Sequence, residues 1–294
     1  MTNLPAHHKI AQALVGTRVG ERYEIVDMVS SGQNTSVFKA HHILLDKPVA
    51  IKVMFIRMEK DENLFLRFKR EASTAARLRH VNICALEDFW FSDDGFPYIV
   101  MEYIPGKTVL NYMANCQDRR LNTEDACGIV MQVCDALDYA HKQGIIHRDI
   151  TPRNIMLHLN TVKLIDFGLA KSLYDAGAKL SMDGTIYGTP TFLSPEQCEH
   201  KELDSRTDIY SLGCVMFMML AGYPPFREQN IVKLLKRHIE EMPDFEEAEI
   251  PRKVVPVIEK AMAKNRDERF QSAKELKDCL RVMGYKPEFP GGLV

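Results

Sequence analysis

The sequence comprises 294 residues, of which 46% are hydrophobic and 27% are charged. This composition excludes a disordered chain and supplies enough apolar side chains for one or two cores. The 38 basic and 40 acidic residues nearly cancel, so we expect no nucleic-acid partner and no attraction of the whole chain to an anionic membrane.

The seven cysteines are odd in number and form no C-x-x-C pair. This pattern predicts reduced thiols in a cytoplasmic protein rather than a disulfide framework or a zinc site. Residues 1–22 form an N-terminal extension without the unbroken apolar segment of a secretory signal. The extension could cap the region that follows, dock a partner or be disordered.

From Tyr23 to Tyr103 the chain reads as a series of short strands. The runs are rich in Val, Ile and aromatic residues, which favour strands, and Asp-Asp-Gly at 93–95 predicts a hairpin turn between two of them. One predicted helix, over residues 62–79, interrupts the series. Steps of three and four residues place apolar side chains on one face of this helix, with Glu71 among them.

A carboxylate in an apolar face is costly unless a base pairs with it, so Glu71 requires a basic partner. Lys52 is the partner that the sequence offers, because it ends the apolar strand Val-Ala-Ile-Lys at 49–52. We expect Lys52, oriented by Glu71, to hold the α- and β-phosphates of a nucleotide. In isolation, so short a motif favours the alternative of a strand-edge lysine that reaches solvent.

After Pro105-Gly106 the hydrophobic periodicity becomes helical. It predicts a helix ending near Gly144 and then helices over 206–221, 229–241, 252–264 and 272–283. The most apolar run, 212–221, is shorter than the roughly 20 residues of a membrane span, so we expect no membrane segment.

The predicted fold class is therefore α+β with two lobes. A β-rich N-lobe with one helix (23–101) is followed by a hinge (102–106), a mostly α-helical C-lobe (107–284) and a tail (285–294). Ligands usually bind in the cleft between such lobes.

Two polar motifs carry the expected chemistry. His-Arg-Asp-Ile-Thr-Pro-Arg-Asn at 147–154 places Asp149 and Asn154 five residues apart on a tight loop. This spacing suits orientation of the proton of an attacking hydroxyl and ligation of Mg²⁺. His147 is interpreted as a packed structural imidazole rather than a catalytic base. Asp166, in Asp-Phe-Gly at the end of an apolar run, is the second expected Mg²⁺ ligand.

In this order and spacing the motifs resemble the serine/threonine protein kinase superfamily, most closely its bacterial Hanks-type branch. The resemblance extends from Tyr23 to about Met283 and includes the segments 188–197, 208–213 and 222–226. It implies a two-lobed kinase fold and transfer of the γ-phosphate of ATP, with Mg²⁺, to protein substrates.

The resemblance also implies roles for individual residues. Met101 would be the gatekeeper, and the Glu102 and Ile104 backbones would bond adenine. The adenine ring would lie between three apolar side chains, Val37, Ala50 and Met156. Glu196 would pair with Arg269 as a structural brace. Thr189, with Leu169 after Asp-Phe-Gly, resembles the serine/threonine pattern and is grouped with the catalytic residues.

Arg148, beside Asp149, suggests control by phosphorylation, since an arginine can pair with a phosphate on the activation loop. Thr185 and Ser181 are the expected phosphosites, and Asp183 could supply a fixed negative charge. A homodimer is the candidate assembly for autophosphorylation in trans. The alternative is a solvated loop without a regulatory role.

Two departures from the family pattern bear on activity. Of the glycine-rich loop only Gly32 remains, with Ser30 and Thr35 in place of the outer glycines, so added β-carbons should loosen or shift nucleotide binding. Thr151 stands where serine/threonine kinases usually have lysine. Arg153, two residues later, could supply the missing charge.

Two functional hypotheses follow. The first is an active serine/threonine kinase that uses five polar residues, Lys52, Glu71, Asp149, Asn154 and Asp166. The second is a pseudokinase that acts as a nucleotide-binding or scaffolding module. Retention of all five favours catalysis, because a scaffold has no physical need for two Mg²⁺ ligands. A small-molecule phosphotransferase is disfavoured by the peptide-docking segment 188–196.

Overall fold

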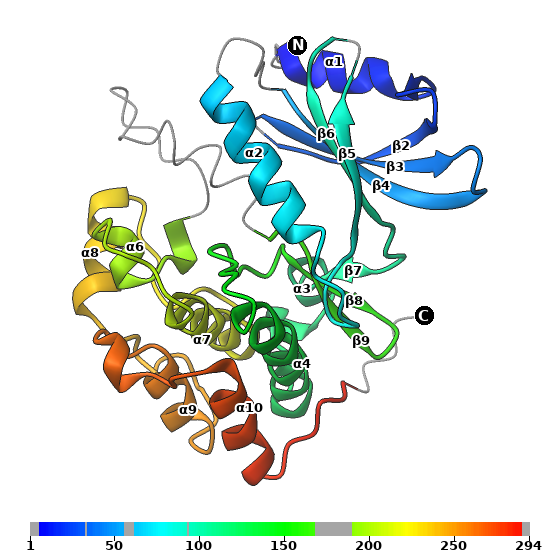
Figure 1. Ribbon diagram of the computed structural model, residues 1–294. Coiled ribbons are helices and arrows are strands. Elements are labelled where there is room, and N and C mark those ends of the chain that lie inside the picture. Colours follow the sequence, from blue (N-terminus) through cyan, green and yellow to red (C-terminus); the bar gives the residue numbers. More distant parts are fainter. Residues whose placement is uncertain (1–5, 33, 56–61, 93, 168–189, 290–294) are drawn as a thin grey trace. The chain divides into compact units, whose positions relative to one another are not determined.

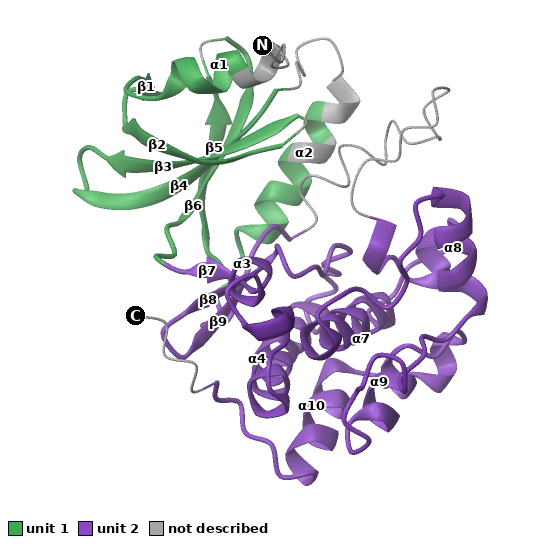
Figure 2. Cartoon of the chain, turned by 180° about the vertical axis from the view of Figure 1, so that it is seen from behind, with its two compact units in different colours: residues 1–79, 84–105 green, residues 80–83, 106–294 purple. Residues whose placement is uncertain are grey.

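The computed structural model describes the chain except residues 1–5, 33, 56–61, 93, 168–189 and 290–294 (Figure 1). The chain divides into two compact units, coloured separately in Figure 2. Unit 1 comprises residues 1–79 and 84–105, and unit 2 comprises residues 80–83 and 106–294. Unit 1 is dominated by strands and unit 2 by helices, which confirms the predicted α+β class.

Unit 1 is built on a six-stranded antiparallel sheet in the order β1-β2-β3-β4-β6-β5. Its strands are β1 (Arg18–Val19), β2 (Tyr23–Ser31), β3 (Thr35–His42), β4 (Lys47–Met54), β5 (Leu86–Phe91) and β6 (Pro97–Glu102). The predicted hairpin between β5 and β6 is confirmed. Its turn places Gly95 at φ 78°, a backbone conformation that glycine adopts without steric cost.

One face of this sheet forms the apolar core of unit 1. Side chains alternate between the two faces of a strand, and this face carries Phe38, Ala40, Ile51 and Val100. Helix α1 (Ala6–Leu14) contributes Ala11, which has no exposed surface, to the same cluster. Of the three possibilities left open for the extension, the structure thus shows capping of the sheet.

Helix α2 (Glu62–Ala75) ends four residues earlier than predicted. The Thr74 hydroxyl donates to the Arg70 carbonyl oxygen at 2.8 Å, a local bond that competes with continuation of the helix. The backbone then tightens, with Arg77 N donating to Thr74 O and Leu78 N to Ala75 O. Apolar periodicity continues through this turn, which is why the sequence alone extended the helix to Arg79.

Unit 2 packs helices around two buried central ones, α4 (Thr123–His141) and α7 (Arg206–Ala221) (Figure 1). Among the described residues, the other α-helices of this unit are α3 (Val109–Met113), α6 (Pro195–Cys198), α8 (Ile231–Glu240), α9 (Val255–Ala261) and α10 (Ala273–Val282). A small sheet joins β7 (Lys107–Thr108), β8 (Ile155–His158) and β9 (Thr161–Leu164). The five helices predicted for this half are confirmed, with α9 shorter than expected.

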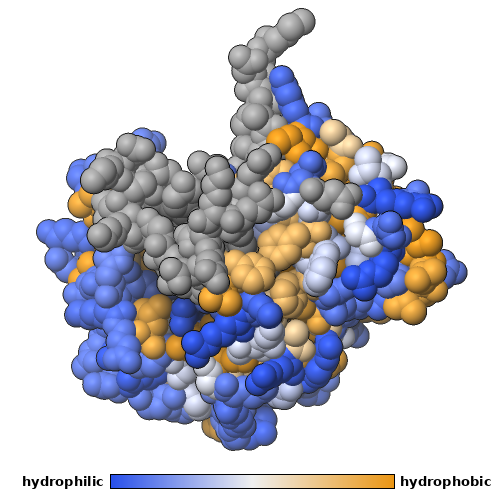
Figure 3. Space-filling view, turned by 45° about the horizontal axis from the view of Figure 1, so that its top comes forward, coloured by the Kyte–Doolittle hydropathy of each residue, from blue (hydrophilic) through white to orange (hydrophobic). Residues whose placement is uncertain are grey.

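Hydrophilic residues surround smaller hydrophobic groups on the face shown in Figure 3. Some large apolar side chains, such as Leu44 at 80% exposure and Val282 at 86%, extend into solvent, as is usual for globular domains. Within the described residues, no helix combines the length and hydrophobicity needed to cross a membrane.

Candidate active site

The residues predicted to contact the nucleotide in unit 1 lie on the sheet face opposite the apolar core. Strand pairing sets Val37 of β3 opposite Lys52 of β4, and Ala50 of β4 opposite Met101 of β6. Directly paired residues point to the same face, so the four side chains share one surface. Val37 and Ala50 are half-buried, as residues that could contact a planar ring would be.

Lys52 and Glu71 both belong to unit 1. Lys52 is 8% exposed within β4. Glu71 lies on α2 and is half-buried, with its Oε2 atom shielded from solvent. Both side chains are thus placed where a charge requires compensation, and their ion pair stays a prediction.

The turn between β2 and β3 contains the remaining glycine of the predicted phosphate loop. Gly32 N donates to Thr35 O at 2.7 Å, and Ser36 Oγ donates to Ser31 Oγ at 3.1 Å. A β-carbon on Gly32 would meet Thr35 Oγ1 at 3.4 Å, an ordinary contact. The hairpin is therefore closed by its own hydrogen bonds, in a conformation that does not require glycine at position 32.

The predicted adenine-binding backbone follows Met101. Glu102 N donates to Ala85 O at 2.9 Å, and Cys84 Sγ donates to Glu102 O at 3.6 Å. A thiol is a weak hydrogen-bond donor, so the bond from Cys84 to this carbonyl oxygen is weak. Ile104, two residues later, is 9% exposed.

In unit 2, a buried aspartate shapes the predicted catalytic loop, residues 147–154. Asp208, at the start of α7, accepts from His147 N through Oδ2 and from Arg148 N through Oδ1, both at 2.8 Å. Its Oδ2 also lies 2.7 Å from His141 Nε2. Burial alone would raise the pKa of Asp208, but the hydrogen bond and charge of His141 and the proximity of His147 hold it below its usual value. The carboxylate therefore stays charged and fixes the loop backbone.

His147 is fully buried, which confirms its interpretation as a packed imidazole. Its Nε2 lies 2.8 Å from Ile165 O, and its ring centroid lies 4.6 Å from that of Phe167. Asp149 N donates to His147 Nδ1 at 3.2 Å. The imidazole thus joins the catalytic loop to the segment that carries Asp166.

Asp149 and Asn154 are brought together as the spacing predicts. Asn154 Nδ2 donates to both Asp149 O and Asp149 Oδ2, each at 2.9 Å. Ile165 N donates to Asn154 O at 2.9 Å. Asp166 therefore directly follows a residue whose backbone is bonded to Asn154. Asp166 has φ 62°, a left-handed conformation that aspartate tolerates better than most residues.

Arg148 has φ 67°, and its carbonyl oxygen accepts from Gln197 Nε2 at 3.0 Å. Thr151 is 6% exposed, whereas Arg153 is exposed to solvent. Met156 of β8 is half-buried. Thr151, which stands where serine/threonine kinases usually have lysine, is therefore buried. Arg153, which could supply the missing positive charge, is exposed.

The predicted brace between Glu196 and Arg269 is confirmed. Arg269 Nη1 and Nη2 donate to Glu196 Oε1 and Oε2, each at 2.8 Å, and both side chains are buried. The other predicted residues of the activation segment lie outside the described residues: Gly168, Leu169, Ser181, Asp183, Thr185 and Thr189.

Sequence reasoning missed three residues that hold the site: His141, Gln197 and Asp208. Each acts on the catalytic loop from at least six residues away in sequence. His141 lies in the last turn of α4. Asp208 begins the segment 208–213, which the sequence marked only as the start of a buried helix. Their pairing depends on how two helices pack, which periodicity does not reveal.

The donor chemistry of unit 2 fits a Mg²⁺ ion that arrives with a nucleotide. No cluster of three or more His, Cys, Asp or Glu side chains suited to a metal occurs among the residues that the structure describes. Mg²⁺ usually binds one or two protein carboxylates and completes its shell with water and substrate phosphates. The Asp166 carboxylate and the Asn154 amide oxygen are a donor set of that size and kind.

Comparison with known proteins identifies the family. The sequence model of the family described as "Protein kinase domain" matches residues 23–281. The chain is 37% identical over 281 residues to "Serine/threonine-protein kinase PknB" of Mycolicibacterium smegmatis, covering 92% of this chain and 45% of the relative. It is also 37% identical over 269 residues to a probable PknB of Corynebacterium glutamicum, covering 88% of this chain and 41% of that relative. The chain thus spans less than half the length of these relatives.

Solved structures confirm the fold. The crystal structure of the Mycobacterium tuberculosis PknI kinase domain aligns with a TM-score of 0.74 at 27% identity, over 91% of this chain and 97% of that chain. A match of this extent takes in both the sheet of unit 1 and the helices of unit 2. The chain therefore belongs to the protein kinase family and is homologous to the PknB-type serine/threonine kinases of bacteria.

Proposed function

We propose that this chain transfers the γ-phosphate of ATP to serine or threonine hydroxyls of proteins, its own activation segment included. The observation that carries the proposal is the arrangement of Asp149, Asn154 and Asp166 in unit 2. Asp149 supplies a carboxylate held by an amide, and Asp166 supplies a second carboxylate in the segment whose backbone bonds Asn154. Together they provide a hydroxyl-orienting group and Mg²⁺ ligands.

In this mechanism Asp149 accepts a hydrogen bond from the substrate hydroxyl and directs its oxygen at the γ-phosphorus. Asn154 Nδ2 holds the Asp149 carboxylate, while Asn154 Oδ1 and the Asp166 carboxylate would hold Mg²⁺. When bound, Mg²⁺ neutralises charge on the β- and γ-phosphates.

Lys52, oriented by Glu71, would hold the α- and β-phosphates. Val37, Ala50 and Met156 would contact the adenine ring, with Met101 as the gatekeeper. Strand register supports the unit 1 part of this proposal, because it puts Val37, Ala50, Lys52 and Met101 on one face. Glu102 and Ile104 would bond adenine, and Gly32 would approach the phosphates. Thr189 would contribute to the preference for serine and threonine.

A mass-spectrometric assay of the purified chain tests the proposal. After incubation with ATP and Mg²⁺, we expect phosphate on Thr185 or Ser181 and on an added protein substrate. Neither should be labelled when EDTA is present or when Lys52 is replaced by methionine. If the rate of phosphate incorporation per molecule rises with the concentration of the chain, one copy phosphorylates another.

One observation favours the pseudokinase as a second candidate. The β2–β3 turn is closed by its own hydrogen bonds and bears Ser30 and Thr35 in place of glycines, which gives a phosphate less access to backbone N–H groups. Nucleotide binding without any transfer of phosphate to the chain or to a substrate would establish this candidate and overturn the kinase.

Replacing Arg153 with alanine should slow phosphoryl transfer by about 10²-fold, because a charge that stabilises the transition state would be lost. Arg153 is exposed, so the melting temperature should not change. Initial rates and ATP affinity would be measured side by side, and the affinity should be nearly unchanged. Lysine at position 153 should retain most of the rate. Full activity of the alanine variant would show that Arg153 does not replace the missing lysine.

A further inference from the structure

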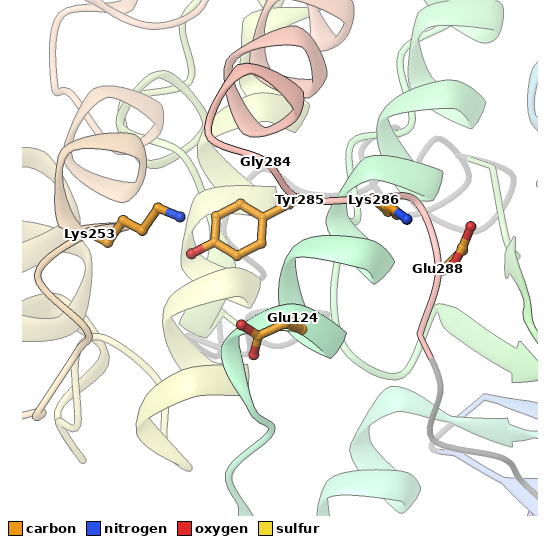
Figure 4. A pocket seen from close by; sticks show the side chains of 6 residues that line it. All are labelled: Glu124, Lys253, Gly284, Tyr285, Lys286 and Glu288. Atoms are coloured by element: carbon orange, nitrogen blue, oxygen red, sulfur yellow. The ribbon is translucent and has the colours of Figure 1, made fainter.

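The described residues that follow α10 remain packed on unit 2. In this C-terminal strap, defined here as residues 285–289, Tyr285 is 9% exposed and Phe289 only 1%. Lys253 Nζ donates to Met283 O at 2.9 Å and lies 4.7 Å from the centroid of the Tyr285 ring. Figure 4 shows this start of the strap, with the Tyr285 ring between Lys253 and Glu124 of α4.

The strap then crosses α4 at a glycine. A β-carbon on Gly128 would lie 2.0 Å from Glu288 O and 3.2 Å from Lys286 O, so no larger residue fits without displacing the strap. Glycine inside a helix is less favourable than alanine. Close approach of the strap backbone is the physical reason that the structure offers for glycine at this position.

One turn further along α4, Gln132 bonds the strap to the small sheet. Its Nε2 donates to Pro287 O and to Asn160 O, both at 3.0 Å. Its Oε1 accepts from Val162 N and from Asn82 Nδ2, both at 2.9 Å. Gln132 is 7% exposed, and its side-chain amide makes all four of these bonds at once.

These bonds converge on β9, the strand that leads to Asp166. Asn82 Nδ2 also donates to Val162 O at 2.8 Å, and Leu164 N donates to Asn82 O at 2.8 Å. Immediately after β9, Ile165 N donates to Asn154 O. A continuous series of buried and partly buried hydrogen bonds therefore runs from Pro287 through Gln132 and β9 to the segment holding Asn154 and Asp166.

We infer that the strap, held by Gly128 and Gln132, positions β9 so that Asn154 and Asp166 keep the geometry required for phosphoryl transfer. Gln132 is in this sense a positioning residue. The inference rests on the proposed kinase activity. It concerns a segment outside the match to the kinase family model, which ends at residue 281.

The Gly128→Ala variant isolates this effect, because alanine favours the helix itself and clashes only with the strap. We expect kcat to fall by about tenfold and the Mg²⁺ concentration for half-maximal rate to rise, with the KM for the protein substrate unchanged. Hydrogen exchange in residues 161–165 should become about fivefold faster, since Val162 N and Leu164 N lose support. A merely structural role could speed exchange at this strand, but it would leave the Mg²⁺ requirement unchanged.

A chain that ends at Gly284, and so lacks the strap, is the matched control. It should show the same changes in kcat, Mg²⁺ requirement and exchange as Gly128→Ala. Adding Gly128→Ala to this shortened chain should cause no further change, because the strap that alanine would displace is already absent. Unchanged kcat, Mg²⁺ requirement and exchange in Gly128→Ala would overturn the inference while the kinase proposal stands. An unmodified chain that transfers no phosphate would overturn the kinase proposal instead. In that case faster exchange at 161–165 would still support the coupling of strap to β9, and unchanged exchange would reject it.

Discussion

Asparagine in place of Asp149 should reduce the rate of phosphoryl transfer by about 10³-fold while leaving the fold unchanged, the loss expected when a positioned proton acceptor is removed. Asparagine has nearly the same shape, and its amide oxygen can still accept from Asn154 Nδ2, which donates to Asp149 Oδ2 at 2.9 Å in the native chain. The charge that attracts the hydroxyl proton is lost. Initial rates at saturating ATP and Mg²⁺, with melting temperatures, would measure both effects.

Asp46→Asn provides the matched control for this substitution. Asp46 lies in the turn between β3 and β4 with its side chain 93% exposed and φ at 47°, a conformation that asparagine also tolerates. The rate of phosphoryl transfer by the Asp46→Asn variant should equal that of the native chain. If Asp149→Asn retained native activity, Asp149 would not be the hydroxyl-orienting group, and the assignment of the catalytic loop would have to change.

The sequence predicted those parts of the site that depend on local spacing. Asp149 and Asn154 are five residues apart, and the chain between them can bring their side chains together only in a tight loop. Alternation along β3 and β4 likewise places Val37 and Lys52 on one face once the strands pair. Such contacts follow from a period or a short loop, which a single sequence displays.

Other parts could not be predicted, because they depend on packing between distant segments. Asp208 approaches His147 and Arg148 only through the placement of α7, and Gln132 approaches Pro287 only because the chain returns past α4 after α10. Nothing in the sequence near Asp208 or Gln132 indicates which backbone groups they bond. Capping of the sheet by α1 was similarly one of three open possibilities, since a short amphipathic segment has several ways to bury its apolar face.

Replacing Arg269 with alanine should destabilise unit 2 by about 3–5 kcal/mol, because it leaves the buried Glu196 carboxylate without its partner. Besides its two bonds to Glu196, the guanidinium donates from Nε to Ala263 O at 2.7 Å and from Nη1 to Arg206 O at 3.1 Å. Arg269 thus also binds the backbone carbonyl oxygens of two other segments of unit 2. Urea unfolding followed by far-UV circular dichroism, which reports chiefly on the helices of unit 2, would measure the loss.

The pH dependence of this loss separates charge from packing. Burial tends to raise the pKa of Glu196, but the Arg269 hydrogen bonds and charge lower it below the ordinary value of 4.5. In the native chain this pair therefore stabilises the fold above about pH 4.5, and its contribution falls as the pH drops through the lowered pKa. In Arg269→Ala, burial should instead raise the pKa of Glu196, so protonation in mild acid relieves the unpaired charge. The difference in stability between the two chains should be largest near pH 7 and smaller at pH 5. A difference independent of pH would assign the loss to packing and backbone hydrogen bonds, with Glu196 contributing little through its charge.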